Sequence, residues 1–132
     1  LGGINGVTKL DASTGSELGS TFVTDVIDST ATSIAIRRDA TWFTANSRAR
    51  LWRIPPAGNT VDDSFEVGAG PNAVAVDEEG IVWVVSGGDG SVSHLDPRQD
   101  SAETIEIGSS PGAILTAFGH VWTSPGAPIP AG

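Results

Sequence analysis

Hydrophobic and polar residues alternate in short runs along the chain, and each run ends at turn-forming residues. The pattern is clearest in segment 71–110, where apolar and β-branched residues gather at 73–76, 81–85, 91–95 and 104–107. Runs of this length, bounded by Gly, Asp, Ser or Pro, are typical of β-strands separated by tight turns. The second run is continuously apolar, as in a strand buried on both faces. The segment therefore predicts four short strands, of which the last alternates and is half exposed.

The same pattern recurs about every 40 residues. Ile34, Val74 and Ile114 are separated by 40 residues each, and Pro71 and Pro111 keep the same spacing. Three further sets of positions recur at similar intervals: Ile36, Val76 and Thr116; Trp42, Trp83 and Trp122; Leu10, Ile54 and Leu95. Self-similarity at such a period indicates a repeat architecture.

Four antiparallel strands in each repeat predict the blade of a β-propeller. A β-sandwich of about a dozen strands is compatible with the composition, but it gives no reason for the repeat. Small residues at Ala35, Ala75 and Ala113 suit an innermost strand, because blades crowd toward the propeller axis. We expect the repeated tryptophans to pack between neighbouring blades. The predicted fold class is thus all-β, with four-stranded antiparallel blades.

The repeat divides the chain into about three blades, which form an incomplete ring because propellers close with about four to eight. Residues 1–30 are predicted as a half blade of third and outer strands, 31–70 and 71–110 as full blades, and 111–124 as a half blade of inner and second strands. Residues 125–132 form a Pro- and Gly-rich tail. Since the half blades are complementary, the expected partners are the remaining blades of a longer propeller or a second copy of the chain, two copies making about six blades.

Composition and charge exclude several classes of function. The 132 residues include 17 Gly, 8 Pro and no Cys, so long helices, disulfide frameworks, zinc fingers and Cys–His nucleophiles are not expected. No apolar run approaches the ~20 residues of a membrane-spanning helix, so we expect no membrane insertion. The formal net charge of −9 repels phosphate backbones, so we expect no nucleic-acid partner.

Two stretches carry a resemblance to known families. "PNAVAVDEEGIVWVVSGGDGSVSHLDP" at 71–97, followed by "TIEIGSSPGAI" at 104–114, resembles the repeats of bacterial YVTN/NHL-type β-propellers. "TWFTANSRARLWRIPPAG" at 41–58 is similar to blades of the streptogramin (virginiamycin B) lyases. The first resemblance implies a propeller fold that serves many functions. The second implies metal-assisted lyase chemistry, carried by His and Glu side chains at one propeller face.

The lyase chemistry does not transfer residue by residue. Ala45 and Asn46 stand where lyase blades commonly place an acidic residue, and neither histidine lies in such a blade. His94 aligns with basic residues in the other repeats, which predicts a solvent-facing position, and His120 is assigned to a turn. The enzyme interpretation is therefore weaker than that of a binding module.

Three short motifs are assigned to turns. Residues 108–112 read G-x-S-x-G, the pattern of a nucleophile elbow, but Pro111 has no N–H to stabilise an oxyanion and no acidic residue follows. Residues 87–90 suggest a glycine–aspartate calcium loop, yet only one copy is present. The carboxylates at 77–79 could share a divalent cation, although a solvated turn is the simpler interpretation.

Basic residues are concentrated in one window. Five of the seven lie within 37–53, where Asp39 is the single acid, and all five are arginines: Arg37, Arg38, Arg48, Arg50 and Arg53. Guanidinium groups bind carboxylates and phosphates with paired hydrogen bonds, which favours a small anionic ligand. Pairing with carboxylates on adjoining blades is the alternative. The candidate ligand contacts, on loops that join strands and blades, are Arg48, Arg50, Asn46, Asp89 and Asn72.

These features together favour a non-catalytic binding or interaction module within a larger bacterial propeller protein. We expect no catalytic residue, no metal ligand and no cofactor, with a small anionic ligand or a protein as partner. One alternative is an enzyme of the streptogramin lyase or lactonase kind, which would require a divalent cation. The other is a structural sensor domain of a receptor, kinase or regulator. The family resemblance favours an extracytoplasmic location, secreted or periplasmic.

Overall fold

The computed structural model of the chain describes residues 6–22, 31–37, 40–45, 48–56, 60–99 and 101–124. Within these ranges all regular structure is β-strand. No helix in the described part of the chain is long and apolar enough to cross a membrane. The predicted tail, residues 125–132, and the candidate contact Asn46 lie outside the described residues.

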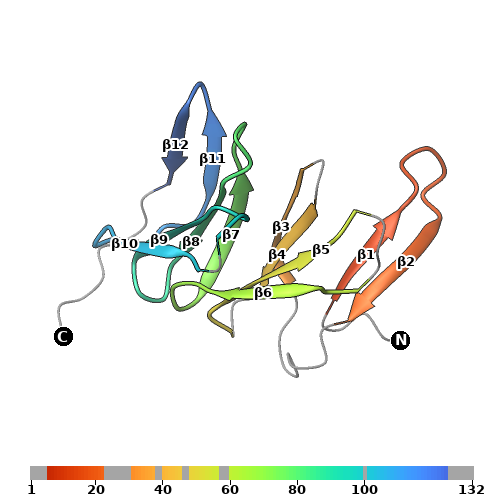
Figure 1. Ribbon diagram of the computed structural model, residues 1–132, viewed down its shortest axis with the longest axis horizontal. Coiled ribbons are helices and arrows are strands. Elements are labelled where there is room, and N and C mark those ends of the chain that lie inside the picture. The colour runs from red at the N-terminus through yellow and green to blue at the C-terminus, as the bar shows by residue number, and fades with distance from the viewer. Residues whose placement is uncertain are drawn as a thin grey trace.

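Two four-stranded antiparallel sheets form the centre of the molecule (Figure 1). In each sheet the strands pair in the order in which they follow one another along the chain. The first sheet consists of β3 (Ala31–Arg37), β4 (Ala40–Ala45), β5 (Arg50–Ile54) and β6 (Asp63–Glu66). The second consists of β7 (Pro71–Val76), β8 (Val82–Ser86), β9 (Ser91–Leu95) and β10 (Glu103–Glu106). The prediction of four-stranded antiparallel blades is thereby confirmed.

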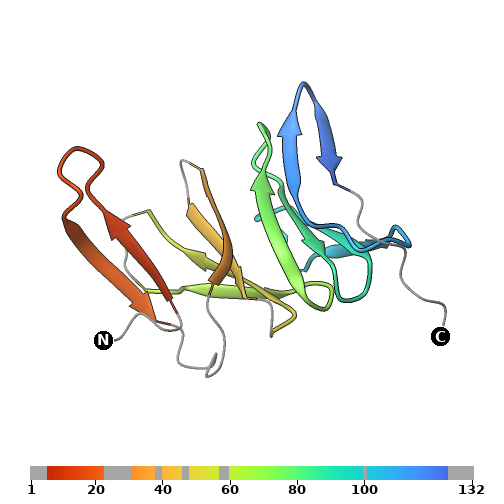
Figure 2. The same ribbon diagram turned by 180° about the vertical axis from the view of Figure 1, so that it is seen from behind.

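A two-stranded sheet lies at each end of this pair. One is formed by β1 (Gly6–Leu10) and β2 (Glu17–Phe22), the other by β11 (Ile114–Ala117) and β12 (His120–Thr123). The four sheets fan out side by side without closing into a ring, as both ribbon views show (Figures 1 and 2). The chain therefore forms about three blades of an open propeller.

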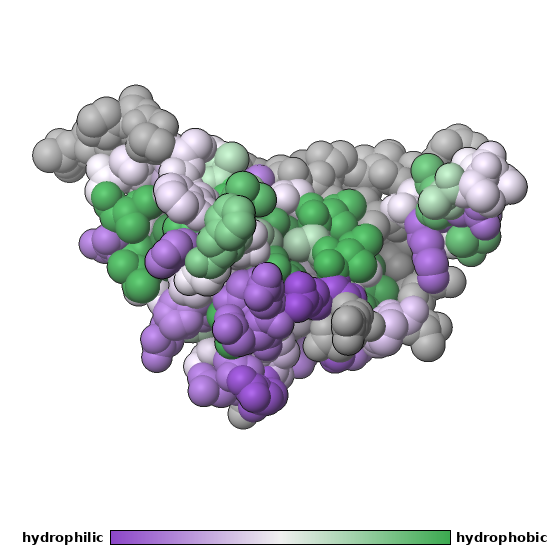
Figure 3. Space-filling view, turned by 90° about the horizontal axis from the view of Figure 1, so that it is seen from above, coloured by the Kyte–Doolittle hydropathy of each residue, from purple (hydrophilic) through white to green (hydrophobic). Residues whose placement is uncertain are grey.

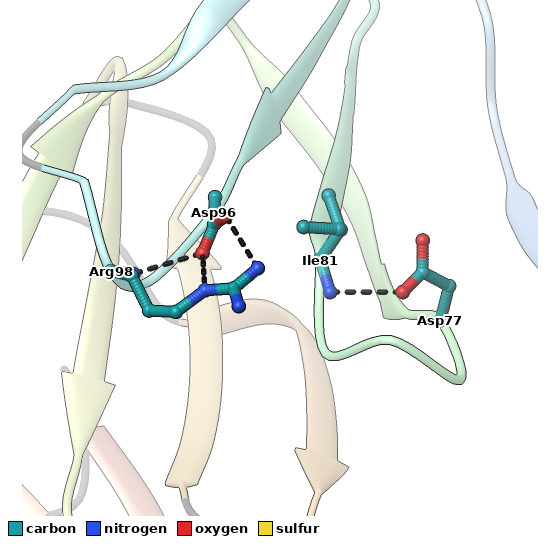
Figure 4. Close-up of polar contacts among 4 residues, drawn as sticks. All are labelled: Asp77, Ile81, Asp96 and Arg98. Carbon is teal, nitrogen blue, oxygen red and sulfur yellow. Dashed lines mark hydrogen bonds and ion pairs between the residues drawn. The ribbon is translucent and has the colours of Figure 1, made fainter.

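The turn between β7 and β8 shows why these short strands stop and restart where they do (Figure 4). Asp77 Oδ1 accepts a hydrogen bond from the Ile81 backbone N–H at 2.9 Å, and the Asp77 backbone N–H donates to the Ile81 carbonyl at 3.0 Å. Gly80 has φ +88°, a left-handed conformation that glycine adopts without steric cost. The Asp-x-x-Gly spacing thus sets the hairpin that leads into the buried strand β8.

The main core lies between the two four-stranded sheets. Trp42 is 1% exposed and belongs to one buried cluster with Val74, Val82 and Leu95 of the next blade. Ala35, on the inner strand β3, packs against the same cluster, as its small size predicted. A second cluster on the other face of the β3–β6 sheet contains Phe43 and Trp52, whose rings stack with centroids 5.4 Å apart. Side-chain alternation therefore gives each blade two apolar faces.

The three repeated tryptophans differ in burial, and within the described chain Trp122 does not pack between blades as predicted. Trp42 is buried and Trp83 is half buried, but Trp122 is 56% exposed. The physical reason is positional, because each tryptophan points toward the blade that follows it. Within the described residues no sheet follows β12.

Candidate functional site

One end of the blades is formed by the connections β4–β5, β6–β7, β8–β9 and β10–β11, which we call the loop face. Backbone hydrogen bonds join these connections across the sequence: Val67 N donates to Ala49 O at 3.0 Å, and Gly88 N donates to Ala69 O at 3.0 Å. Four of the five predicted contacts, Arg48, Arg50, Asn72 and Asp89, lie on or beside these connections. The fold therefore brings them to one end of the molecule.

Asp89 and Asn72 are held by the protein itself. Asp89 Oδ2 accepts a hydrogen bond from the Ala69 backbone N–H at 2.9 Å, and its Oδ1 accepts one from Ser91 Oγ at 2.6 Å. Asn72 Nδ2 donates to the Pro111 carbonyl at 2.9 Å. Each side chain thus joins a strand or turn of one blade to the connection that enters or leaves it. We infer a positioning role for both residues.

The β8–β9 turn, residues 87–90, packs closely against the β6–β7 connection and Asn72. A Cβ at Gly88 would lie 2.7 Å from the Ala69 carbonyl oxygen, and a Cβ at Gly87 would overlap Asn72 Nδ2. Glycine at these positions allows the β6–β7 and β8–β9 connections to approach each other directly. The hairpin-turn interpretation of this motif agrees with that packing.

The G-x-S-x-G motif lies in the β10–β11 connection. Ser110 Oγ donates a hydrogen bond to the Gly87 carbonyl at 3.1 Å, so its proton is directed at a backbone oxygen of the previous blade. Pro111 is buried beside it. The serine therefore ties two blades together, in agreement with its assignment to an interblade connection.

Ser86, at the end of β8, has a fully buried hydroxyl with no hydrogen-bond partner among the described residues. Its neighbours on the loop face are polar, since Ser91 and Ser93 are also buried there. Ser93 Oγ is satisfied by Thr104 Oγ1 at 2.8 Å, and Ser91 is held by Asp89. Ser86 is thus the member of this buried serine group that has no hydrogen-bond partner among the described residues.

The arginines divide into two groups. Arg53 pairs with Asp62 at 2.8 Å, Arg37 donates to the Glu78 carbonyl of the next blade at 2.7 Å, and Arg98 pairs with Asp96 at 2.8 Å. Arg48 and Arg50 form no side-chain ion pair or hydrogen bond with any described residue. Arg48 is exposed and Arg50 is half buried, opposite Glu66 in the strand register. Pairing within the protein thus explains Arg37 and Arg53 of the 37–53 window but not Arg48 and Arg50.

The opposite end of the blades contains a hollow of about 240 Å³ between the β7–β8 and β11–β12 hairpins. Its wall includes the carboxylates of the 77–79 turn, the indole of Trp83, and Phe118 and His120 of the second hairpin. Trp83 Nε1 donates to Asp77 Oδ2 at 2.9 Å, which fixes the indole at this edge. Carboxylates and an indole thus line the side of the hollow formed by the β7–β8 hairpin and β8, and Phe118 and His120 line the side of the β11–β12 hairpin.

A second hollow, about 340 Å³ in volume, lies on the other side of the Trp83 indole. His94 stacks on Trp83 with centroids 5.0 Å apart, and its Nε2 lies 3.3 Å from Glu103 Oε2. His94 is therefore half buried, and the prediction of a plain solvent-facing histidine is wrong in this respect. The repeat predicted that Trp83 packs between blades. It did not predict the contact between Trp83 and His94.

Asp96 and Arg98 close the β9–β10 turn beside this second hollow (Figure 4). Side-chain hydrogen bonds from Arg98, with the Nε donor at 2.8 Å, and a backbone hydrogen bond hold the pKa of Asp96 below its ordinary value. The same contacts raise the pKa of Arg98. Arg98 is exposed and Asp96 is half buried, and their mutual hydrogen bonds organise the turn.

The residues that the structure describes do not make up a metal centre. No group of three or more His, Asp or Glu side chains in the described part of the chain lies close enough together to hold a metal ion. His120 and Asp77 line the same hollow, but Asp77 already accepts hydrogen bonds from Ile81 and Trp83. The donor set thus does not fit the divalent cation that the lyase-like alternative requires.

Comparison with known proteins gives a fold but no sequence family. No family model matches the sequence. No curated protein matches it either. Solved structures are similar, among them a structure described as streptogramin B lyase, with a TM-score of 0.79 and 18% identity over 92% of this chain. Virginiamycin B lyase from Staphylococcus aureus gives a TM-score of 0.77, also with 18% identity over 92% of the chain.

The Dos1 propeller is a further neighbour, with a TM-score of 0.59 and 20% identity over 75% of this chain. The chain spans 41%, 42% and 26% of the lengths of these three structures. At such identities the likeness shows the fold alone. It confirms the predicted β-propeller and the structural resemblance to streptogramin lyases.

Proposed function

We propose that the chain is a non-catalytic binding module whose loop face takes a small anionic ligand through Arg48 and Arg50. The observation that supports this is the contrast among the arginines. Arg37, Arg53 and Arg98 each hold an acceptor of the protein. Arg48 and Arg50 hold none among the described residues, although the chain carries sixteen acidic side chains.

The chemistry of the two side chains suits a carboxylate or phosphate group. A guanidinium presents a planar set of N–H donors that can make two parallel hydrogen bonds to such a group. Arg48 follows β4 and Arg50 begins β5, so both are anchored by a buried sheet whose position the Val67–Ala49 hydrogen bond reinforces. Asn72 and Asp89 contribute by holding the neighbouring connections in place.

Calorimetric titration with inorganic phosphate and with succinate tests this proposal. Hydrogen bonds to charged groups contribute about 1.5–3 kcal/mol, so Arg48→Ala with Arg50→Ala is expected to weaken binding roughly tenfold or more at low salt. Arg98→Ala is the matched control, because it removes the same charge from the opposite end of the blades. Equal binding by all three proteins, or no binding by the unmodified chain, would contradict the proposal.

The alternative is a metal-assisted enzyme of the lyase or lactonase kind. What supports it is the fold likeness and the presence of His120 and the carboxylates of residues 77–79 in the wall of one hollow, although as placed these groups are not close enough together to hold a metal ion. Titration with Mg²⁺ or Mn²⁺ distinguishes the two functions. A saturable site lost in His120→Ala would favour the enzyme, whereas a response that is unchanged in this variant would favour the binding module.

A further inference from the structure

Apolar side chains remain exposed on the two half blades, and their repeat counterparts are buried. Trp122 of β12 is 56% exposed, whereas Trp42 at the same repeat position is 1% exposed. Leu10 of β1 is 57% exposed, whereas Leu95 at the corresponding position of β9 is 1% exposed. The complete interface between the β3–β6 and β7–β10 sheets thus shows what each exposed residue would contact if the neighbouring blade were present: a following blade for Trp122 and a preceding blade for Leu10.

The facing surface of the β3–β6 sheet is uncovered in the same way. Ile34 and Ile36 of β3 are exposed large hydrophobic residues. Their counterparts on β7 are Val74, which is buried against the Trp42 cluster, and Val76, which is half buried against it. Figure 3 shows hydrophobic surface both on the side of the β11–β12 hairpin and over the middle of the molecule. In the described chain, the β11–β12 hairpin and the β3–β6 sheet therefore each present an apolar surface that no neighbouring blade covers.

The exposed strand edges match these surfaces. In the described chain β12 pairs with β11 alone and β1 pairs with β2 alone, whereas each complete sheet has four strands. The free edge of β12 is equivalent to the edge of β8 that receives β9, and β1 is equivalent to β9. An unpaired strand edge presents N–H and C=O groups that readily accept another strand.

We propose that β12 pairs with β1 of a second copy of the chain, so that β11 and β12 of one copy and β1 and β2 of the other form a composite blade. Strand order and direction are then those of the complete sheets. The described residues of each copy contribute two complete and two half blades, so two copies close a ring of about six blades, within the range known for propellers.

The repeat also sets the register of the proposed pair. In the complete blades Trp83 lies opposite His94 and Trp42 lies opposite Arg53. The same alignment places Trp122 opposite Lys9, with Thr123 opposite Thr8. A basic residue then lies beside the tryptophan in every blade, and the Lys9 ammonium can rest on the indole face as a cation–π contact.

The hollow of about 340 Å³ beside Trp83 is explained by the same pairing. In the complete interface the Trp42 cluster is closed by Leu95 on the third strand of the following blade. The blade that follows Trp83 has no third strand in the described chain. In the composite blade, Leu10 of the second copy takes this position. The hollow is thus an unfilled blade interface and not a ligand pocket.

Disulfide trapping tests the register directly, because the chain has no cysteine. Two singly substituted copies, Thr8→Cys and Thr123→Cys, carry different tags and are mixed under mild oxidation at ~150 mM salt. Directly opposed residues of an antiparallel pair have Cα atoms about 4.5–5.5 Å apart, within disulfide reach. We expect a crosslinked species that carries both tags. Two control mixtures should give little crosslinked species. One combines Thr8→Cys with Val121→Cys, which lies two residues out of register, and the other combines Thr14→Cys with Thr123→Cys.

Native mass measurement across protein concentrations tests the assembly itself. The unmodified chain should be found at twice its mass of 13.4 kDa. Trp122→Ser should weaken assembly roughly 30-fold, as expected for a central aromatic contact. Ile105→Ser is the matched control, because Ile105 is 52% exposed but lies on the outer strand β10. It should leave assembly unchanged.

The results separate the possible occupants of this surface. A monomer at all concentrations with no Thr8–Thr123 crosslink overturns the proposal and assigns the surface to further blades or to another protein. Equal crosslinking by the out-of-register pair overturns the register. Assemblies larger than two copies with the specific crosslink support the strand pairing and overturn the six-bladed closure. None of these outcomes depends on anion binding at Arg48 and Arg50.

Discussion

Trp42 provides the most direct test of where the core lies. Its side chain is 1% exposed, packs against Val74, Val82 and Leu95 of the next blade, and has its ring centroid 6.0 Å from that of Phe65. Replacing a buried tryptophan by alanine removes the transfer free energy of the indole and leaves a cavity, at a cost of about 3–5 kcal/mol. We therefore expect Trp42→Ala to remove a large part of the stability of the two complete blades.

Urea unfolding followed by circular dichroism measures this change without relying on the tryptophan that is removed. With a slope of about 2 kcal/mol per M, the midpoint should fall by roughly 2 M. Trp42→Phe, which refills most of the volume, should lose less, and Ile105→Ala at an exposed position should lose about 0.5 kcal/mol or less. A loss below about 1 kcal/mol in Trp42→Ala would refute the placement of the core between the blades.

Three further predictions concern single groups. Ser86→Ala should be neutral or stabilising by urea unfolding, because it removes a buried hydroxyl that has no partner among the described residues; a loss above about 1 kcal/mol would reveal a hidden partner. Gly88→Ala should destabilise by about 1–3 kcal/mol, since its Cβ would lie 2.7 Å from the Ala69 carbonyl oxygen, and an unchanged midpoint would contradict that packing. Arg98→Ala should raise the pKa of Asp96 toward its ordinary value in an NMR titration. Because the pKa of Asp96 is lowered in the folded state, its hydrogen bonds stabilise the unmodified protein at pH values above the ordinary pKa. This contribution is lost as the pH falls through the pKa of the folded state. An identical titration of Asp96 in both proteins would contradict the hydrogen-bonded pair.

The candidate site could be predicted in part. The sequence placed Arg48, Arg50, Asn72 and Asp89 on connections, and the fold does bring those connections to one end of the blades. It could not assign Asn72 and Asp89 to structural hydrogen bonds, because their acceptor and donor, at Pro111 and Ala69, are 39 and 20 residues away in the chain. Such pairs become visible only once the blades are placed next to one another.

Local contacts explain why the fold could be predicted from the sequence. The Asp77 carboxylate accepts hydrogen bonds from the Ile81 backbone N–H, four residues later, and from the Trp83 indole, six residues later. A short stretch of sequence therefore contains all the residues that form this turn. Alternating apolar residues then give each strand its two faces, and the 40-residue period repeats the unit. Because these interactions lie within one blade, they leave a pattern in the sequence of that blade.

The sequence by itself therefore determined the repeat, the four strands of each complete blade and the turns between them. The tertiary structure alone decided which repeat positions are buried. Trp42, Trp83 and Trp122 hold equivalent positions, yet the first is buried, the second half buried and the third exposed. The reason is that the strands of a blade form their hydrogen bonds with one another, whereas the tryptophan on the face of a blade is buried only by the blade that follows.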